Sequence, residues 1–225
     1  MQVKLVSTTQ PILQLKRQGI KNPEDLIVYC ARVSNPSNQF NNETAPKLIA
    51  YLIKHKHWSP FEMVDMTVEI KTSRAIAAQI LRHRSFSFQE FSQRYSEATN
   101  LEPIEWRLQG STNRQVGDEK LELQSELNGA IEDFLGASVV VYNHLIENGI
   151  AKECARMLLP LCTETTMYMK GSIRSWIHYI LIRAAQETQK EHREIAEQIK
   201  NIFVSKFPNV AQALDWKKVN PQASF

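Results

Sequence analysis

The stretch MVDMTVEIKTSRAIAAQILRH, residues 63–83, contains a strand pattern followed directly by a helix pattern. In residues 63–71 apolar and polar side chains alternate, which is the period of a half-buried β-strand. The side chains expected to face the core are Val64, Met66, Val68 and Ile70. From Ser73 onward the apolar residues recur at helical spacing. We therefore predict a strand that leads straight into a helix.

Outward from this unit the patterns are mostly helical. A short strand is predicted over residues 3–7, and helices over 22–34, 44–58, 119–148, 152–159 and 172–206. Asn22 is suited to cap the first of these helices, with Pro23 at its first position, and Pro160 is expected to end the helix over 152–159. The side chains expected to face inward from the first two are Leu26, Ile27, Cys30, Val33, Leu48, Ile49, Leu52 and Ile53. Residues 97–118 are polar and irregular, which indicates a surface excursion. The order strand, helices, strand, helices predicts an α+β fold in a single domain, residues 1–225.

Composition limits the function classes. The chain of 225 residues is 43% apolar and 23% charged, and its net charge is +3. A charge this small does not demand a nucleic-acid partner, and no stretch is apolar for long enough to predict a membrane span. The three cysteines form no CxxC pair, so neither a disulfide framework nor a metal site is predicted. Together with the absence of an apolar signal core at the N-terminus, they favour the cytoplasm.

The stretch RHRSFSFQEFSQRYS, residues 82–96, concentrates basic side chains. One interpretation is a solvated basic helix end, which suits the negative end of the helix dipole. Another is an anion site, in which Ser92 and Arg94 alternate with Glu90 along an extended segment that follows the basic helix end. Phe86, Phe88 and Phe91 are then expected to pack beneath. The chain has seven glycines and no GxGxxG or GxxxxGK[ST], so it is not expected to hold a nucleotide in a glycine-rich loop.

The same stretch resembles the signature of flavin-dependent thymidylate synthases: Arg-His-Arg, seven residues, then Ser92 and Arg94-Tyr95-Ser96. The resemblance continues in HKHWSPFE (55–62), ARVS (31–34), ARMLLP (155–160) and GSIRSWIHYILIRAAQETQKEHREIA (171–196). It covers most of the chain except residues near 97–118 and the C-terminal tail. It implies an α+β fold with a small antiparallel sheet, and an enzyme that methylates dUMP to dTMP. Methylenetetrahydrofolate would supply the carbon and NADPH-reduced FAD the hydride. It also implies a homotetramer with active sites between subunits.

The resemblance implies two sets of site residues. The dUMP-binding set is Gln79, Arg82, Glu90, Phe91, Ser92, Gln93, Arg94, Arg156 and Arg183. The FAD-binding set is Ser59, Arg82, His83, Arg84, Glu90, Ser172, Ile173, Arg174 and His178, with His57 and Ser34 as possible further contacts to flavin or folate. Arg183 matches the arginine that faces the uracil ring and favours ionisation at N3, since a guanidinium stabilises a nearby anion.

Local chemistry adds three expectations about these residues. Arg174 and His178 are four residues apart and share a helix face, whereas Arg183 lies about half a revolution away. The two faces are therefore expected to serve different sites or neighbouring subunits. Ser59 and Glu62 also fit a capping box at a helical turn. An isolated His57 is, on local pattern alone, an ordinary histidine at a helix end.

Some positions depart from the family pattern, and two other functions fit parts of the sequence. Gln89 stands where many members have Asn, Ser172 where some have Asn, and CTETTMYMK (162–170) lacks the more usual Tyr-Thr-aromatic pattern. A cysteine-nucleophile transferase would use Cys154, two residues before Arg156, although no Cys–His pairing is visible. A nucleotide- or RNA-binding module would use the arginines and aromatic residues of 82–96, and its affinity would fall steeply with salt.

Overall fold

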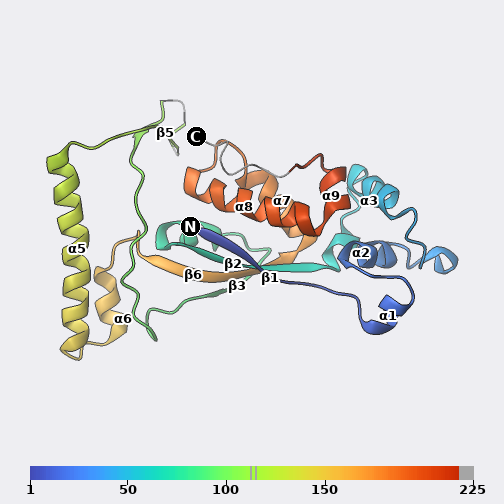
Figure 1. Cartoon of the computed structure of the whole chain (residues 1–225), viewed down its shortest axis with the longest axis horizontal. Coiled ribbons are helices and arrows are strands. Elements are labelled where there is room, and N and C mark those ends of the chain that lie inside the picture. Colours follow the sequence, from blue (N-terminus) through green and yellow to red (C-terminus); the bar gives the residue numbers. More distant parts are fainter. Residues whose placement is uncertain (112, 115, 218–225) are drawn as a thin grey trace.

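The computed structural model describes residues 1–111, 113, 114 and 116–217. Its centre is a four-stranded antiparallel sheet with strand order β1-β2-β6-β3. The strands are β1 (Gln2–Thr8), β2 (Asp65–Ser73), β6 (Glu164–Ser172) and β3 (Ser87–Glu90). With the helices packed around this sheet, the structure has the helix-rich α+β fold that the sequence predicts (Figure 1).

Strand β2 has the alternation that its sequence predicts. The four side chains expected to face the core are fully buried, and Lys71 on the other side is exposed. β2 pairs with β6 over its whole length, from Asp65 opposite Ser172 to Ser73 opposite Glu164. These two strands are therefore the middle of the sheet, and their pairing fixes where the segments that follow them begin.

Strand β6 was not predicted. Its inward positions are occupied by Thr165, Met167, Met169 and Gly171. Since only the two methionines are large and apolar, the alternation is weak as a sequence signal. Gly171 is required by close packing, because a Cβ there would lie 2.5 Å from the ring of Phe86.

Three helices cover one face of the sheet: α4 (Arg74–Ile80), α7 (Ile173–Arg183) and α8 (Lys190–Lys206) (Figure 1). α4 begins at the end of β2, where the Ser73 hydroxyl accepts a hydrogen bond from the Ile76 N–H at 3.4 Å. α7 begins at the end of β6 in the same way, with Ser172 as its cap. Because β2 and β6 are antiparallel, α4 and α7 start from opposite ends of the sheet.

A second group of helices packs at one end of the sheet. They are α2 (Pro23–Ala31), α3 (Ala45–Lys54) and α9 (Pro208–Ala213), with α1 (Leu13–Arg17) beyond them (Figure 1). The predicted Asn22 cap is confirmed: its side chain accepts from the Asp25 N–H at 2.9 Å. The prediction that Val33 faces inward is wrong, because α2 ends at Ala31 and Val33 is 69% exposed in the turn that follows.

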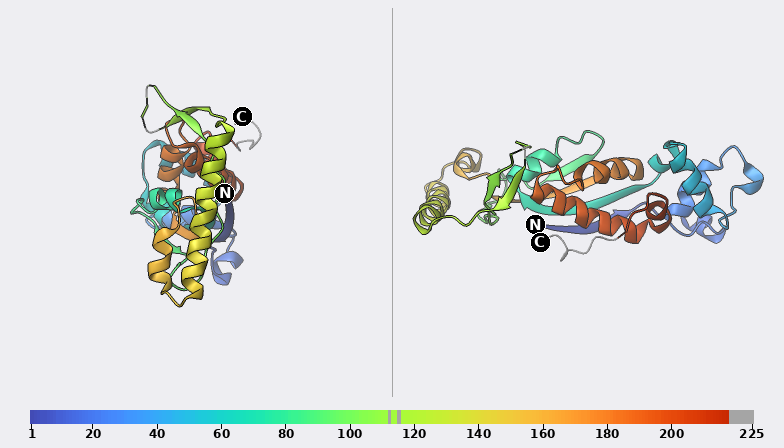
Figure 2. Two further views of the ribbon diagram at one scale, coloured as in Figure 1. Left: turned by 90° about the vertical axis from the view of Figure 1, so that its left-hand side faces the viewer. Right: turned by 90° about the horizontal axis from the view of Figure 1, so that it is seen from above.

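At the opposite end of the sheet, a helical arm stands away from the core (Figures 1 and 2). The arm consists of α5 (Ser125–Glu147), α6 (Lys152–Ala155) and the short 3-10 turn η3 (Arg156–Leu158). Tyr142 is the one buried side chain of α5, whereas Phe134, Val140 and Val141 are exposed. In the part of the chain that the structure describes, no helix has the length and apolar character needed to cross a membrane.

The predicted surface excursion contains a hairpin. Strands β4 (Arg107–Gln109) and β5 (Gly117–Lys120) pair antiparallel. Ion pairs fasten this hairpin to the start of α8, between Arg107 and Glu191 and between Lys190 and Glu105 at 2.8 Å. Over its described residues, the segment 97–118 is thus less irregular than its polar composition suggests.

Several predicted helix boundaries are wrong. The predicted helix over 172–206 is divided between α7 and α8 by residues 184–189, where the Thr188 hydroxyl donates to the Ile182 carbonyl and Arg193 donates to the Gln186 carbonyl. The helix predicted from 119 begins at Ser125, because residues 117–120 belong to β5. The helices predicted over 44–58 and 152–159 end earlier, at Lys54 and Ala155.

Candidate functional site

A cavity of about 400 Å³ lies against one face of α7, beside the 3-10 turn η2 (Ser59–Glu62). Its lining combines apolar and charged side chains: Trp58, Glu62, Ser85, Arg174, Ser175, Ile177, His178 and Leu181. Arg174 and His178 line it together, as their spacing predicted, and Arg183 does not. The Arg174 guanidinium pairs with Glu62 at 2.6 Å, and about half of each side chain is exposed.

The predicted capping box at Ser59 is wrong. In η2 the residue before the turn is Trp58, and no side chain caps it. Instead of turning back to the N–H at the start of the turn, the Glu62 carboxylate reaches Arg174 on α7. Ser59 is exposed beside the cavity lining, and His57 and Ser34 are also exposed.

Two further members of the predicted FAD set have structural roles at the start of α7. The Ser172 hydroxyl accepts from the Ser175 N–H at 3.3 Å. Ile173 is fully buried, and its N–H donates to the Val64 carbonyl at 2.9 Å. The side chain of Ile173 therefore packs in the core and does not line the cavity.

The predicted basic cluster follows α4, and its residues point in different directions. Arg82 and Arg84 are exposed, whereas His83 is half-buried against α7. The His83 ring packs edge-on against Tyr179, with the ring centroids 4.9 Å apart. Its Nε2 accepts a hydrogen bond from Nε of Arg183 at 2.9 Å.

This contact defines the protonation state of His83. Burial, together with the positive charges of Arg183 and His178, lowers the pKa of His83 to about 4. His83 is therefore neutral near pH 7 and carries its proton on Nδ1, because Nε2 accepts. Arg183 is oriented through its Nε, which leaves the two terminal nitrogens of the guanidinium for a ligand.

Gln79 lies beside this pair, at the junction of α4 and α8. Its side-chain amide donates to Gln189 Oε1 at 2.7 Å and contacts His192 Nδ1 at 3.3 Å. His192 is fully buried, and its Nε2 lies 3.1 Å from the Tyr179 hydroxyl. The structure thus brings Gln79, His83 and Arg183 to one region at the C-terminal ends of α4 and α7.

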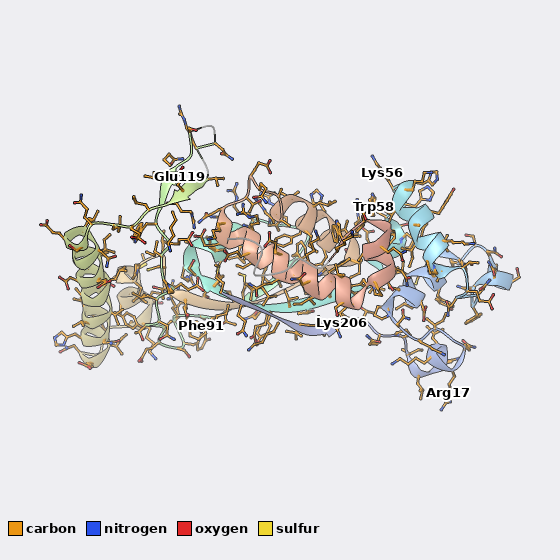
Figure 3. The ribbon with its side chains drawn as sticks, turned by 45° about the horizontal axis from the view of Figure 1, so that its top comes forward. Arg17, Lys56, Trp58, Phe91, Glu119 and Lys206 are labelled. Atoms are coloured by element: carbon orange, nitrogen blue, oxygen red, sulfur yellow. The ribbon has the colours of Figure 1, made fainter. Side chains whose placement is uncertain are left out.

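Other predicted nucleotide-binding residues lie toward the arm. Glu90, at the end of β3, accepts from Arg74 at 3.0 Å and from the Thr165 hydroxyl at 2.9 Å. Phe91 is 36% exposed. In Figure 3, Phe91 and the cavity residue Trp58 lie toward opposite ends of the sheet.

The extended segment predicted through Ser92 and Arg94 is wrong beyond Phe91. β3 ends at Glu90, and the chain turns, with the Tyr95 N–H donating to the Ser92 carbonyl at 3.0 Å. Tyr95 in turn accepts from Lys152 of the arm at 3.3 Å. Residues 92–97 are therefore held against the arm.

Two donors near this turn have no partner within the described chain. Gln93 is 5% exposed, and its Nε2 makes no hydrogen bond; the same holds for the buried Nε of Arg156 on η3. Buried donors without partners are uncommon in a complete site. Among the described residues, no hydrogen bond or ion pair joins Gln93 or Arg156 to Gln79 or Arg183.

Known proteins resemble this chain over most of its length. A family model described as "thymidylate synthase complementing protein" matches residues 16–209. The chain is 50% identical over 219 residues to a probable flavin-dependent thymidylate synthase of Paramecium bursaria Chlorella virus 1, covering 96% of this chain and 100% of the relative. It is 52% identical over 218 residues to the flavin-dependent thymidylate synthase of Synechocystis sp., with the same coverage of each chain.

The chain belongs to the flavin-dependent thymidylate synthase family. Its fold is also similar to that of a UMP/dUMP methylase from Streptomyces cacaoi, whose crystal structure was solved with 5-Br dUMP. The TM-score is 0.77 at 23% sequence identity, over 97% of this chain and 96% of the other. At that identity the likeness concerns the fold.

The positions that depart from the family pattern lie in β3, in β6 and at the start of α7. Gln89 is exposed on β3 opposite Tyr168 of β6. Ser172 caps α7, and most of CTETTMYMK forms β6. These positions belong to the sheet and the helix start beside the cavity.

Several residues of the candidate site were not predicted from the sequence. Trp58, Glu62, Ser85 and Ser175 line the cavity, and Gln189 and His192 contact Gln79. Trp58 and Glu62 fall inside the motif HKHWSPFE and were detectable from it. His192 gave no local signal, because a single histidine on the buried face of a helix resembles any core residue.

Proposed function

We propose that the chain is a single-domain enzyme, residues 1–225, which methylates dUMP to dTMP in the cytoplasm. Methylenetetrahydrofolate would donate the carbon, and FAD reduced by NADPH would supply the hydride. The observation that carries this proposal is the identity of 50% or more with flavin-dependent thymidylate synthases over their full lengths. The arrangement of Arg183 and His83 supports it from the chemistry of the site.

The residues around the α7 cavity fit a flavin nucleotide. Trp58, Ile177 and Leu181 provide apolar surface for a ring system, and Arg174 provides a guanidinium for phosphate oxygens. Because the pair of Arg174 with Glu62 is half-exposed, it contributes at most about 1 kcal/mol, so a phosphate can replace it. When bound, FAD supplies hydride chemistry that no side chain of this chain offers.

In this proposal Arg183 acts on the pyrimidine ring. His83 holds Arg183 through Nε, and the positive charge of the guanidinium stabilises the ring anion that forms when N3 ionises. Because His83 is neutral, it does not compete with Arg183 as a second charge. Gln79 and Arg82 would contact the same nucleotide.

In this proposal each complete site combines residues from more than one copy of the chain. Arg183 and Gln79 lie at the ends of α7 and α4, whereas Arg156 belongs to the arm and Gln93 lies in the turn beside it, each with an unpartnered donor. The arm also exposes apolar side chains, Phe134, Val140 and Val141 among them, which suit contact with another copy. We therefore include in the proposal a homotetramer in which each nucleotide site combines residues of different subunits.

No cysteine is assigned a chemical role in this mechanism. Burial raises the pKa of Cys30 and of Cys162, which disfavours their thiolates. Cys154 is exposed on α6 of the arm. Since the proposed route activates the uracil ring through Arg183, a covalent thiol adduct is not needed.

The test is the reaction itself. Purified protein loaded with FAD is incubated with dUMP, methylenetetrahydrofolate and NADPH, and dTMP is measured by chromatography. We expect dTMP to form only when all three are present, and its formation to stop when FAD is removed. Flavin-loaded protein that forms no dTMP under these conditions, or protein that binds no flavin, would refute the proposed function.

A further inference from the structure

A chain of hydrogen bonds runs from the β4–β5 hairpin to the buried core beneath His83. It begins at the Glu191 carboxylate, which pairs with Arg107 and accepts from Gln189 Nε2 at 2.9 Å. It continues through Gln79 to His192 and ends at the Tyr179 hydroxyl. Of the residues joined by these hydrogen bonds, only Gln79 is among those expected to bind the nucleotide.

The chemistry of the groups fixes the direction of every bond in the chain. A carboxylate paired with an arginine can only accept, so Gln189 must turn its NH₂ toward Glu191 and its Oε1 toward Gln79. Gln79 must then turn its own NH₂ toward Gln189, at 2.7 Å. Its Oε1 is left facing His192 Nδ1 at 3.3 Å. The orientation of the Gln79 amide therefore follows from Glu191.

His192 completes the chain because it is neutral. Burial, together with the charges of Arg183 and His83, lowers its pKa to about 3. To donate to Gln79 Oε1, the ring must carry its single proton on Nδ1. Its Nε2 then accepts from the Tyr179 hydroxyl at 3.1 Å, whose pKa is raised by burial, so that it keeps its proton.

We propose that His192 and Gln189 are positioning residues that lock the Gln79 amide, so that its second N–H stays available to an acceptor oxygen of the pyrimidine nucleotide. This inference rests on the function proposed above. The NH₂ group of Gln79 has two hydrogens, and one of them is used in the hydrogen bond to Gln189 Oε1. Without the two neighbours, the Gln79 amide is free to rotate and can present its oxygen instead, which would oppose an acceptor on the ligand.

The test is a double-mutant cycle on the full-length, flavin-loaded enzyme. His192→Leu removes the ring, Gln79→Ala removes the amide, and dUMP affinity is measured by calorimetric titration alongside KM and kcat. We expect His192→Leu to raise the dissociation constant and KM for dUMP by about three- to tenfold, the range of one neutral hydrogen bond, with flavin affinity unchanged. In the Gln79→Ala background, His192→Leu should not change the dissociation constant or KM for dUMP any further.

The conservative variant separates positioning from mere packing. The side-chain NH₂ of His192→Asn can occupy the place of Nδ1–H and donate to Gln79, so dUMP affinity should return to within about twofold of the parent. If His192→Leu does not fold, Gln189→Leu at a half-buried position replaces it, with the same expectation in the cycle.

The outcomes distinguish the two proposals. Equal losses of dUMP affinity with and without Gln79 would overturn the positioning role, as would an unchanged affinity in folded His192→Leu. A parent enzyme that binds flavin but no dUMP would refute the proposed function and this inference with it. Failure of the cycle in an enzyme that binds dUMP refutes the positioning role alone.

Discussion

Gly171→Ala tests the packing between the central strand β6 and the segment that carries the basic cluster. A Cβ at position 171 would lie 2.5 Å from both Cδ1 and Cε1 of Phe86. Phe86 is 9% exposed and packs against Trp176, with ring centroids 4.6 Å apart, and against Tyr179 at 5.8 Å. The ring of Phe86 cannot move away without displacing these neighbours.

The magnitude follows from the overlap. An ordinary carbon–carbon contact is about 3.5–4 Å, so the ring or the strand must shift by about 1 Å or more. Overpacking of a buried site typically costs about 1–3 kcal/mol. For a domain of this size, each kcal/mol lowers Tm by about 2–4 °C, so we expect a fall of about 2–12 °C.

The assay is thermal unfolding by calorimetry or circular dichroism, with parent and variant at the same concentration and flavin loading. The same substitution in a Phe86→Leu background is the control, because leucine lacks the aromatic ring that the new methyl group meets. In the Phe86→Leu background, Gly171→Ala should lower Tm by less than half of its effect in the parent. A Gly171→Ala variant that unfolds at the same temperature as the parent would refute the argument. An equal decrease in Tm when position 86 is leucine would also refute it.

Arg174→Ala should weaken FAD binding by about ten- to a hundredfold in a flavin titration, because one charged hydrogen bond to phosphate contributes about 1.5–3 kcal/mol; unchanged affinity would place the phosphates elsewhere. Arg183→Ala should lower kcat for dTMP formation more than it raises KM for dUMP, since the charge is needed most when N3 ionises; an effect on KM alone would make Arg183 a binding residue. Replacing all three cysteines by alanine should leave dTMP formation intact in folded, flavin-loaded protein, and activity regained by restoring one of them would contradict the thiol-free mechanism. His192 has a pKa lowered to about 3 in the fold and near 6.5 when unfolded, so the unfolded chain binds the extra proton and Tm should fall as the pH drops from about 6.5 toward about 3. His192→Asn should show a shallower decline of Tm over that range, and an identical slope would mean that His192 is not held neutral by the fold.

Much of the local structure was predictable because it depends on neighbours in sequence. The alternation in residues 63–71 indicates burial on one side of a strand, and the four side chains expected to face the core are buried, Val64 just before β2 and the other three within it. The Asn22 cap requires only residues within one helical turn, and the shared face of Arg174 and His178 follows from helical spacing. The family signature likewise depends on spacing along the chain.

Other predictions from the sequence were wrong because tertiary packing overrides the local pattern. β6 lacked a strong apolar alternation because Thr165 and Gly171 occupy inward positions, where the strand is held by β2 and β3 on either side. The break between α7 and α8 contains neither glycine nor proline, and tertiary hydrogen bonds hold it. Glu62 pairs with Arg174, 112 residues away, and no cap forms at its own turn.

The family resemblance implied many residues of the candidate site, but it did not indicate their partners. Arg183 meets His83 across 100 residues, and Gln79 meets Gln189 and His192 across 110 and 113. Hydrophobic periodicity records which face of a segment is buried, since that is a property of the segment. Which polar groups then meet depends on how α4, α7 and α8 pack on the sheet, and only that packing determines the neutral state of both histidines and the direction of the Gln79 amide.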